Sequence, residues 1–213
     1  VATDIDRDVS EMMNRVDKLR FHDFIRAAAC RVGQMLNVHS IASDVGISDK
    51  TAKNWLRILE ASDIVFYLRP YTNKLLKRTV KQAKMYFFDT GLVAYLTAYL
   101  TPEILAKGAL SGAILENYVV SEIRKTFYNT GRTGNLWYYR DKDQNEVDMI
   151  IEQNGHIYPI EIKRTSNPGS ELVKAFEILD KGPLPRGNGA IICTREKLTA
   201  VDAQNFVVPV WMI

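Results

Sequence analysis

The chain of 213 residues is 46% hydrophobic and 25% charged, a composition typical of a folded globular protein with one large domain or two small ones. No apolar run approaches the roughly 20 residues that span a bilayer, and the first residues do not resemble a signal peptide, so we expect no membrane segment. Two cysteines, Cys30 and Cys193, lie far apart in apolar surroundings. We expect Cys30 in the core, no disulfide framework, and a reducing, cytoplasmic setting.

The net charge of +3 averages an uneven distribution. Between residues 49 and 84 the chain carries nine basic and three acidic side chains, a net charge of +6, which leaves −3 for the remainder. The nine basic residues are Lys50, Lys53, Arg57, Arg69, Lys74, Lys77, Arg78, Lys81 and Lys84. This concentration predicts a face that meets a polyanion, and a solvated basic surface without a partner is the alternative.

Apolar residues near helical spacing predict a mostly helical segment over residues 1–37. Two short helices should follow, the first capped by Ser40 and ended by Gly46, the second capped by Ser48. The side chains expected to face inward are Ile41, Ala42 and Val45 in the first helix and Ala52, Trp55, Leu56 and Leu59 in the second. The pattern is that of a helix-turn-helix with a polar, basic outer face on its second helix.

Two strand-like segments, residues 63–71 and 83–90, flank a basic stretch at residues 72–82. A hairpin with a basic tip after a helix-turn-helix predicts a winged helix that contacts a phosphate backbone. The second helix lacks an arginine pair suited to base readout, so a structural or protein-binding module is the alternative. The candidate nucleic-acid-binding residues are Lys50, Lys53, Asn54, Arg57, Lys74, Lys77 and Arg78.

A helical pattern becomes weaker around Pro102 and Gly108, a plausible domain boundary. The C-terminal part of the sequence after it has a different pattern of apolar residues. The patterns predict a helix at 112–128, strands at 135–140, 145–152 and 156–164, a helix at 170–181, and strands at 189–194 and 206–212. This order predicts an α/β fold with a mixed sheet.

The stretch EVDMIIEQNGHIYPIEIK, residues 146–163, contains an Asn154-Gly155 turn that favours type I′ geometry. With Gln153 and His156 as the closing pair, the register places Asp148 opposite Glu161 and Glu146 opposite Lys163, all on one face. The other face, expected to be the core face, carries Val147, Met149, Ile151, Tyr158, Ile160 and Ile162.

Asp148 and Glu161 would then be like charges with Cα atoms roughly 4.5 Å apart, which is destabilising. A raised pKa, the Lys163 ammonium or a divalent ion such as Mg²⁺ must offset the repulsion. The alternative is an ordinary Glu146–Lys163 ion pair with the other two carboxylates exposed to water.

Asp148 followed by Glu161-Ile162-Lys163, with Glu116 on the preceding helix, resembles the PD-(D/E)xK signature of restriction-endonuclease-like nucleases, with Val147 where the family often has Pro. The resemblance implies metal-assisted phosphodiester hydrolysis, with Mg²⁺ on Asp148 and Glu161 and with Glu116 assisting through water. Lys163 would activate water or stabilise charge on the phosphate. It further implies that Arg140, Lys142 and Arg164 steer the nucleic-acid backbone, with Glu146 as a secondary candidate beside Lys163.

Four longer segments, GQMLNVHSIASDVGISDKTAKNWLRILEASDIVFYLRPY, KMYFFDTGLVAYL, GAILENYVVSEIRK and LWYYRDKDQNEVDMIIEQNGHIYPIEIK, resemble the C-terminal portion of a prokaryotic family of AAA+-type ATPases. In that family a winged helix is combined with a nuclease-like domain of unknown function. The resemblance implies a helical linker at residues 1–38, a winged helix-turn-helix domain at 39–100 and a nuclease-like domain at 108–213. The sequence has no GxxxxGK[ST] stretch and begins with Val, so we expect a C-terminal part without an ATP site.

Two hypotheses remain open at this point. The first is a Mg²⁺-dependent nuclease with DNA as the favoured substrate, which the winged helix would bind. The second is a non-catalytic adaptor that binds nucleic acid or a partner protein for the ATPase, its expected neighbour on the same polypeptide. Either is compatible with an oligomer.

Overall fold

The computed structural model describes residues 15–72, 81–132 and 134–213. The N-terminal half, from α2 to α6, contains two strands among its helices. Its elements are α2 (Arg15–Ala29), α3 (Val38–Val45), α4 (Asp49–Ala61), β1 (Val65–Pro70), β2 (Lys84–Phe87), α5 (Thr90–Leu96) and α6 (Pro102–Lys107). The C-terminal half contains α7 (Ser111–Asn129), β3 (Asn135–Arg140), β4 (Glu146–Gln153), β5 (His156–Lys163), the 3-10 helix η1 (Ser170–Lys181), β6 (Gly189–Cys193), β7 (Thr199–Ala200), β8 (Asn205–Pro209) and η2 (Val210–Met212).

The expected pair of short helices is present as α3 and α4. Gly46 ends α3 in the left-handed conformation, with φ at +69°, and the Ser48 side chain caps α4 by accepting the N–H of Thr51. The predicted cap of α3 is wrong: Asn37 caps that helix, and its side chain accepts the N–H of Ser40. The helix therefore begins at Val38, ahead of the expected position.

The helical core of the N-terminal half is aromatic where α2 meets α4. The Trp55 ring stands edge-on to Phe21 and Phe24, at 5.3 Å from each ring centre. The expected inward residues of α4 are all buried. Cys30, in contrast, is exposed rather than in the core, because it follows the last residue of α2 while Ala28 and Ala29 fill the buried side.

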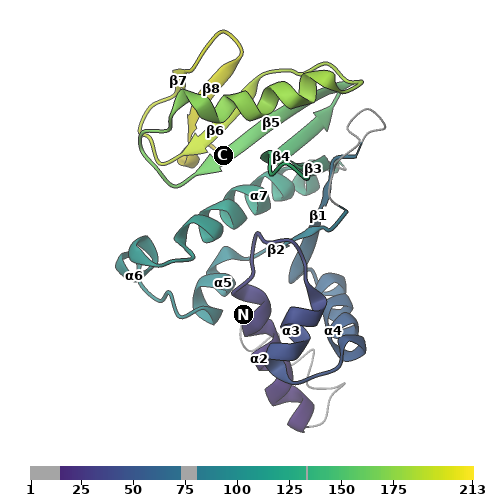
Figure 1. The fold of residues 1–213 in the computed structure, drawn as a ribbon. Coiled ribbons are helices and arrows are strands. Elements are labelled where there is room, and N and C mark those ends of the chain that lie inside the picture. Colours follow the sequence, from purple (N-terminus) through teal and green to yellow (C-terminus); the bar gives the residue numbers. More distant parts are fainter. Residues whose placement is uncertain (1–14, 73–80, 133) are drawn as a thin grey trace.

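One mixed sheet runs through both halves, in the strand order β2-β1-β3-β4-β5-β6-β8-β7. Strands β1 and β2 form an antiparallel hairpin, and the end of β1 pairs in parallel with β3 through Arg69–Trp137 and Pro70–Tyr138. The mixed α/β class expected from the sequence is thus confirmed. The hairpin of the N-terminal half also extends the sheet of the C-terminal half (Figure 1).

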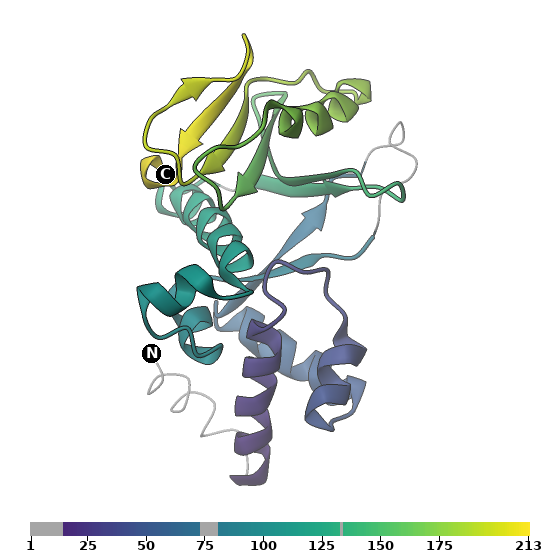
Figure 2. The same ribbon diagram turned by 60° about the vertical axis from the view of Figure 1, so that its left-hand side comes forward.

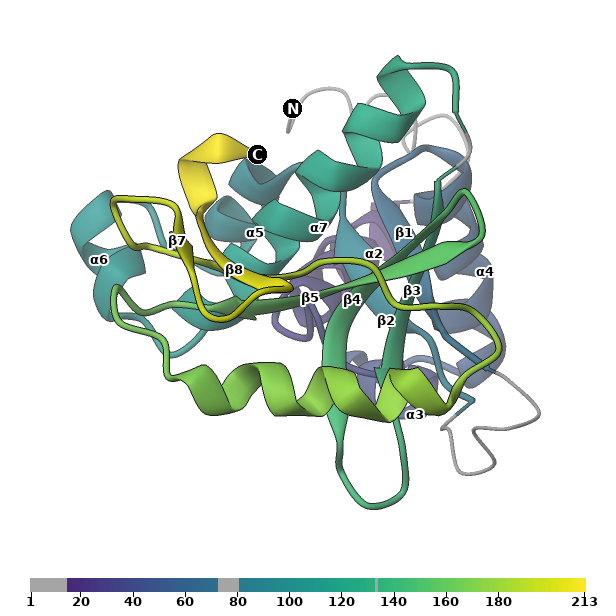
Figure 3. The ribbon, with the colours of Figure 1, turned by 90° about the horizontal axis from the view of Figure 1, so that it is seen from above.

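The central strands are covered on both faces. Figure 3, seen from above, shows β3 to β5 between α7 on one side and η1 on the other. On the α7 side Met149, Ile160 and Ile162 join one buried cluster, while Ile150 and Ile157 pack with Phe176 of η1 in another. The helices α2 to α4 lie away from η1, on the far side of the molecule (Figure 2).

A β-bulge interrupts the pairing of β3 with β4. Trp137 pairs with Ile150, but Tyr139 pairs with Val147, so β4 uses one extra residue over this interval. The extra residue shifts the inside–outside alternation. Val147 consequently packs with Ile150 and Ile157 on the η1 side, and its predicted place beside Met149 is wrong. Within the described part of the chain, no helix is long and apolar enough to cross a membrane.

Candidate functional site

The β4–β5 hairpin has the predicted turn and the predicted register near its tip. Asn154 and Gly155 have φ values of +53° and +74°, as a type I′ turn requires, and the ladder runs from Gln153–His156 to Met149–Ile160. The ladder ends there, one pair before Asp148 and Glu161. Instead, the Asp148 side chain accepts the backbone N–H of Ile162 at 2.8 Å. Asp148 and Glu161 therefore come together beyond the end of the ladder, and their expected ladder pairing is absent.

Three predicted site residues converge at this point. The Nζ atom of Lys163 lies 2.6 Å from Oε1 of Glu161 and 3.6 Å from Oδ2 of Asp148. Asp148 is 6% exposed and Glu161 7%, so both carboxylates have lost most of their water. The Oε2 atom of Glu161 is buried and has no hydrogen-bond partner among the described residues. Burying a carboxylate oxygen without a partner costs free energy unless a cation or a proton binds to it.

The electrostatics of these groups follow from burial and proximity. Burial, together with the Asp148 charge, raises the pKa of Glu161 to about 7, although Lys163 acts in the opposite direction. Burial alone would lower the pKa of Lys163, but the charges of Asp148 and Glu161 outweigh it and raise that pKa. Lys163 is therefore charged at neutral pH, while Glu161 can hold or release a proton there.

Glu116, the third predicted carboxylate, has other partners. Its Oε1 atom accepts the Tyr86 hydroxyl at 2.6 Å and lies 3.1 Å from Nζ of Lys84. Burial raises the pKa of Glu116, and the Lys84 charge opposes that shift. Across residues 15–72, 81–132 and 134–213, no three His, Cys, Asp or Glu side chains are close enough to hold one metal ion. Asp148 and Glu161, which share the Lys163 ammonium, therefore form a pair of carboxylates without a third such side chain close enough to complete a metal-binding group among the described residues.

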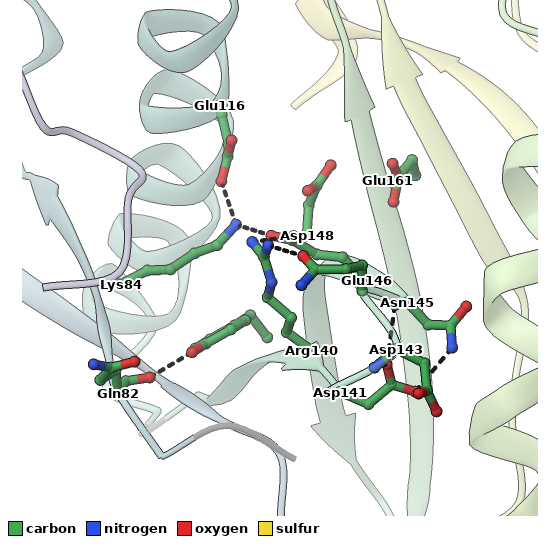
Figure 4. Close-up of polar contacts among 12 residues, drawn as sticks. Gln82, Lys84, Glu116, Arg140, Asp141, Asp143, Asn145, Glu146, Asp148 and Glu161 are labelled. Atoms are coloured by element: carbon green, nitrogen blue, oxygen red, sulfur yellow. Dashed lines mark hydrogen bonds and ion pairs between the residues drawn. The ribbon is translucent and has the colours of Figure 1, made fainter. Parts of the chain in front are cut away.

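Lys84 is the site residue that sequence reasoning missed. The sequence predicts Lys84 on a basic face, but it is only 4% exposed, and its Nζ atom contacts both Glu116 at 3.1 Å and Glu146 at 2.6 Å. Figure 4 shows Lys84 reaching from β2 toward Glu116 on α7 and Glu146 on β4, with Asp148 and Glu161 nearby. Lys84 is the first residue of the strand KMYF, whose four residues are all buried, and this burial is visible only in the folded structure.

The predicted Glu146–Lys163 pair is wrong. Glu146 binds Lys84 and also Arg140, whose Nη1 atom lies 2.9 Å from Oε2 of Glu146. Lys163 turns instead to Glu161 and Asp148. The physical reason is that the β4–β5 ladder has ended before these residues, and Lys163 pairs along the backbone with Cys193 of β6.

The other predicted basic residues lie at the periphery. Arg140 forms an ion pair with Glu146, and Lys142 is exposed. The Nη1 atom of Arg164 donates to the carbonyl oxygen of Ala106 at 2.8 Å. On α4 the predicted nucleic-acid-binding residues are all exposed, namely Lys50, Lys53, Asn54 and Arg57. Lys74, Lys77 and Arg78 lie outside the described residues.

Comparison with known proteins divides the chain into the same two parts. Residues 1–103 match a family model described as "Domain of unknown function (DUF8612)", and residues 111–213 match "Domain of unknown function (DUF4143)". No solved structure matches the chain. Uncharacterized proteins of Mycobacterium bovis and Mycobacterium tuberculosis are each 26% identical to it over 168 residues, which cover 79% of this chain and 37% of each relative. The chain thus spans little more than a third of the length of these curated relatives, to which it is similar through both of its halves.

Proposed function

We propose that the C-terminal half is a Mg²⁺-dependent nuclease-like site that hydrolyses phosphodiester bonds. The observation that carries the proposal is the Oε2 atom of Glu161, which is buried beside Asp148 and lacks a partner among the described residues. Two buried carboxylates with an unsatisfied oxygen form a site that a divalent cation would stabilise. A structural carboxylate in a core would instead have its oxygens hydrogen-bonded.

Each residue of the site has a definite part in this proposal. Asp148 and Glu161 would hold the ion, and the N–H of Ile162 fixes the Asp148 carboxylate in place. When bound, the ion would polarise the phosphodiester and make water a better nucleophile at neutral pH. Lys163, whose Nζ atom lies 2.6 Å from Glu161, would orient the attacking water or stabilise the charge that develops on the phosphate.

The order of the helices and strands also supports a more specific fold within this proposal. The order α3, α4, β1, β2 fits a winged helix, and α7, β3, β4, β5 with later strands fits a restriction-endonuclease-like arrangement. The exposed basic residues of α4 would meet the phosphate backbone, with DNA as the favoured partner. Since the relatives are nearly three times as long as the matched segment, we further propose that an AAA+-type ATPase precedes this part on the same polypeptide.

A non-catalytic adaptor is the second candidate. Lys84, Arg140 and Lys163 place three cations against the four carboxylates of the cluster, Glu116, Glu146, Asp148 and Glu161. Such a cluster is close to neutral without a metal, as a retained but inactive site would be. In that case the exposed face of α4 would still bind nucleic acid.

A cleavage assay separates the two candidates. The chain is incubated with Mg²⁺ or Mn²⁺ and with single- and double-stranded DNA and RNA, beside Asp148→Asn and Lys163→Met variants. The nuclease proposal expects metal-dependent cleavage that falls at least 100-fold in both variants. Equal background cleavage by all three proteins, with nucleic-acid binding retained, would overturn it in favour of the adaptor. A Glu177→Gln variant, altered at an exposed carboxylate of η1, controls for nonspecific effects.

A further inference from the structure

Lys84 belongs to the N-terminal half, yet its charged end lies among carboxylates of the C-terminal half. Its side chain is 5% exposed. The Nζ atom lies 3.1 Å from Glu116 of α7 and 2.6 Å from Glu146 of β4, and 5.4 Å from the centre of the Tyr138 ring. Two elements that are distant in sequence from β2 therefore meet at one ammonium group.

Burying a lysine normally favours its neutral form. Here burial does lower the pKa of Lys84, but the charges of Glu116, Asp148 and Glu146 reverse the effect and raise that pKa above its ordinary value. The ammonium is therefore a permanent cation in the interior. Removing it would leave two partly buried carboxylates without their shared counter-charge, which is strongly unfavourable.

The carboxylates form two pairs, each with a lysine between its members. Lys163 lies between Asp148 and Glu161, and Lys84 lies between Glu116 and Glu146. The two lysines differ in accessibility, because the Lys163 side chain is 41% exposed and can move away, whereas that of Lys84 is enclosed. A divalent ion can displace an exposed ammonium far more readily than an enclosed one.

We propose that Lys84 is the resident cation of the Glu116–Glu146 pair, so that the site accepts one divalent ion, between Asp148 and Glu161, and requires both halves of the chain. The single-ion part rests on the proposed function. Lys84 is in these terms a positioning residue: it holds Glu116 and Glu146 apart from the metal and supplies the positive charge that a second ion would otherwise bring.

The test is the Mn²⁺ stoichiometry of the whole chain, measured at pH 8 by isothermal titration calorimetry and by the electron paramagnetic resonance signal of free Mn²⁺. Wild type is expected to bind one ion, and Lys84→Met two, because the methionine leaves the Glu116–Glu146 pair open. Adding Glu146→Gln to Lys84→Met should return the value to one. If Lys84→Met binds only one ion, as wild type does, the inference is overturned.

A second variant keeps the inference testable if Lys84→Met does not fold. Glu116→Gln leaves Lys84 in place, and because Glu116 is not an ion ligand in this arrangement, the variant should still bind one Mn²⁺ ion. A Glu116→Gln variant that binds no ion would overturn the inference. Wild type that binds no Mn²⁺ would contradict the proposed function, whereas one ion in both wild type and Lys84→Met would contradict only the role of Lys84.

Discussion

The carboxylate of Asp148 accepts a hydrogen bond from the backbone N–H of Ile162 at 2.8 Å, just beyond the last ladder pair of β4 and β5. Because the bond is buried, the N–H of Ile162 needs an acceptor here. The Asp148 side chain replaces the backbone acceptor that a continued ladder would supply. A residue proposed to hold a metal ion thus also holds two strands together where they separate. Substitutions at this position must distinguish these two contributions.

Asp148→Asn and Asp148→Ala should therefore differ in stability. Asparagine retains an oxygen that can accept the N–H of Ile162 and removes the repulsion with Glu161, so its free energy of unfolding should stay within about 1 kcal/mol of wild type. Alanine leaves a buried N–H unpaired and should cost about 1–3 kcal/mol. Urea denaturation at pH 8 measures both. Equal losses in the two variants would show that the hydrogen bond contributes little, and both should lose metal binding in either case.

Glu161 should make stability depend on pH. Its pKa rises from 4.5 to about 7 in the folded protein, first through burial and then through Asp148, so the folded state binds this proton more tightly than the unfolded state. The resulting stabilisation is complete below pH 4.5 and is lost as pH rises through about 7. Glu161→Gln, which mimics the protonated form, should stabilise the protein at pH 8 by on the order of 1–3 kcal/mol and hardly at all at pH 4.

Urea denaturation of Glu161→Gln and wild type at the two pH values, without metal, decides this prediction. The exposed Glu177 of η1 provides the matched control, because Glu177→Gln should have the same small effect at both pH values. A gain from Glu161→Gln that is no larger at pH 8 than at pH 4 would contradict the assigned proton affinity.

The sequence was sufficient where local rules decide the structure. The Asn154-Gly155 turn set the register of the hairpin from Gln153–His156 to Met149–Ile160, and Ser48 marked the start of α4. These features depend on residues adjacent in the chain. The same local register then brought Asp148 and Glu161 close together, which is why the candidate pair could be named from sequence.

The remaining features depend on contacts between distant segments. The β4 bulge appears in the pairing with β3, and the run of apolar residues from Met149 to Ile151 interrupts the alternation without showing where the bulge lies. The burial of Lys84 requires Glu116 and Glu146, which lie more than 30 residues away in sequence and on two other elements. A lysine within a basic segment is far more often a surface residue, so only the folded arrangement distinguishes this one.

Asn117 should couple the two halves of the chain. Its buried amide on α7 accepts the N–H of Phe87 at 2.7 Å and donates to the carbonyl oxygen of Phe87 at 3.1 Å and to Thr90 at 2.8 Å. Asn117→Ala leaves these buried groups unpaired and should cost about 2–4 kcal/mol. Asn129→Ala, at the exposed end of the same helix, is the matched control and should change stability by less than about 0.5 kcal/mol.

The continuous sheet also predicts how Asn117→Ala unfolds. Trp55 reports on the helical core of the N-terminal half and Trp137 on the sheet, so single-tryptophan variants can follow each half by fluorescence. Both probes should show the same midpoint in wild type and the same shift in Asn117→Ala, because β1 pairs with β3. Separate midpoints would show that the two halves unfold independently.

The basic face of α4 should contribute to nucleic-acid affinity through charge alone. Lys53 and Arg57 are exposed, and α4 offers no arginine pair for base readout. Lys53→Gln with Arg57→Gln should therefore weaken binding to duplexes of different sequence by similar factors. The slope of log affinity against log salt should fall by about 0.9 for each phosphate contact removed. Fluorescence anisotropy at several salt concentrations measures both quantities, and Lys174→Gln, an exposed lysine on η1, is the matched control. If the double variant keeps the wild-type slope and its affinity falls for one sequence only, α4 contacts bases and not phosphates. If Lys174→Gln lowers the slope as much as the double variant does, nucleic-acid binding is not localised to α4.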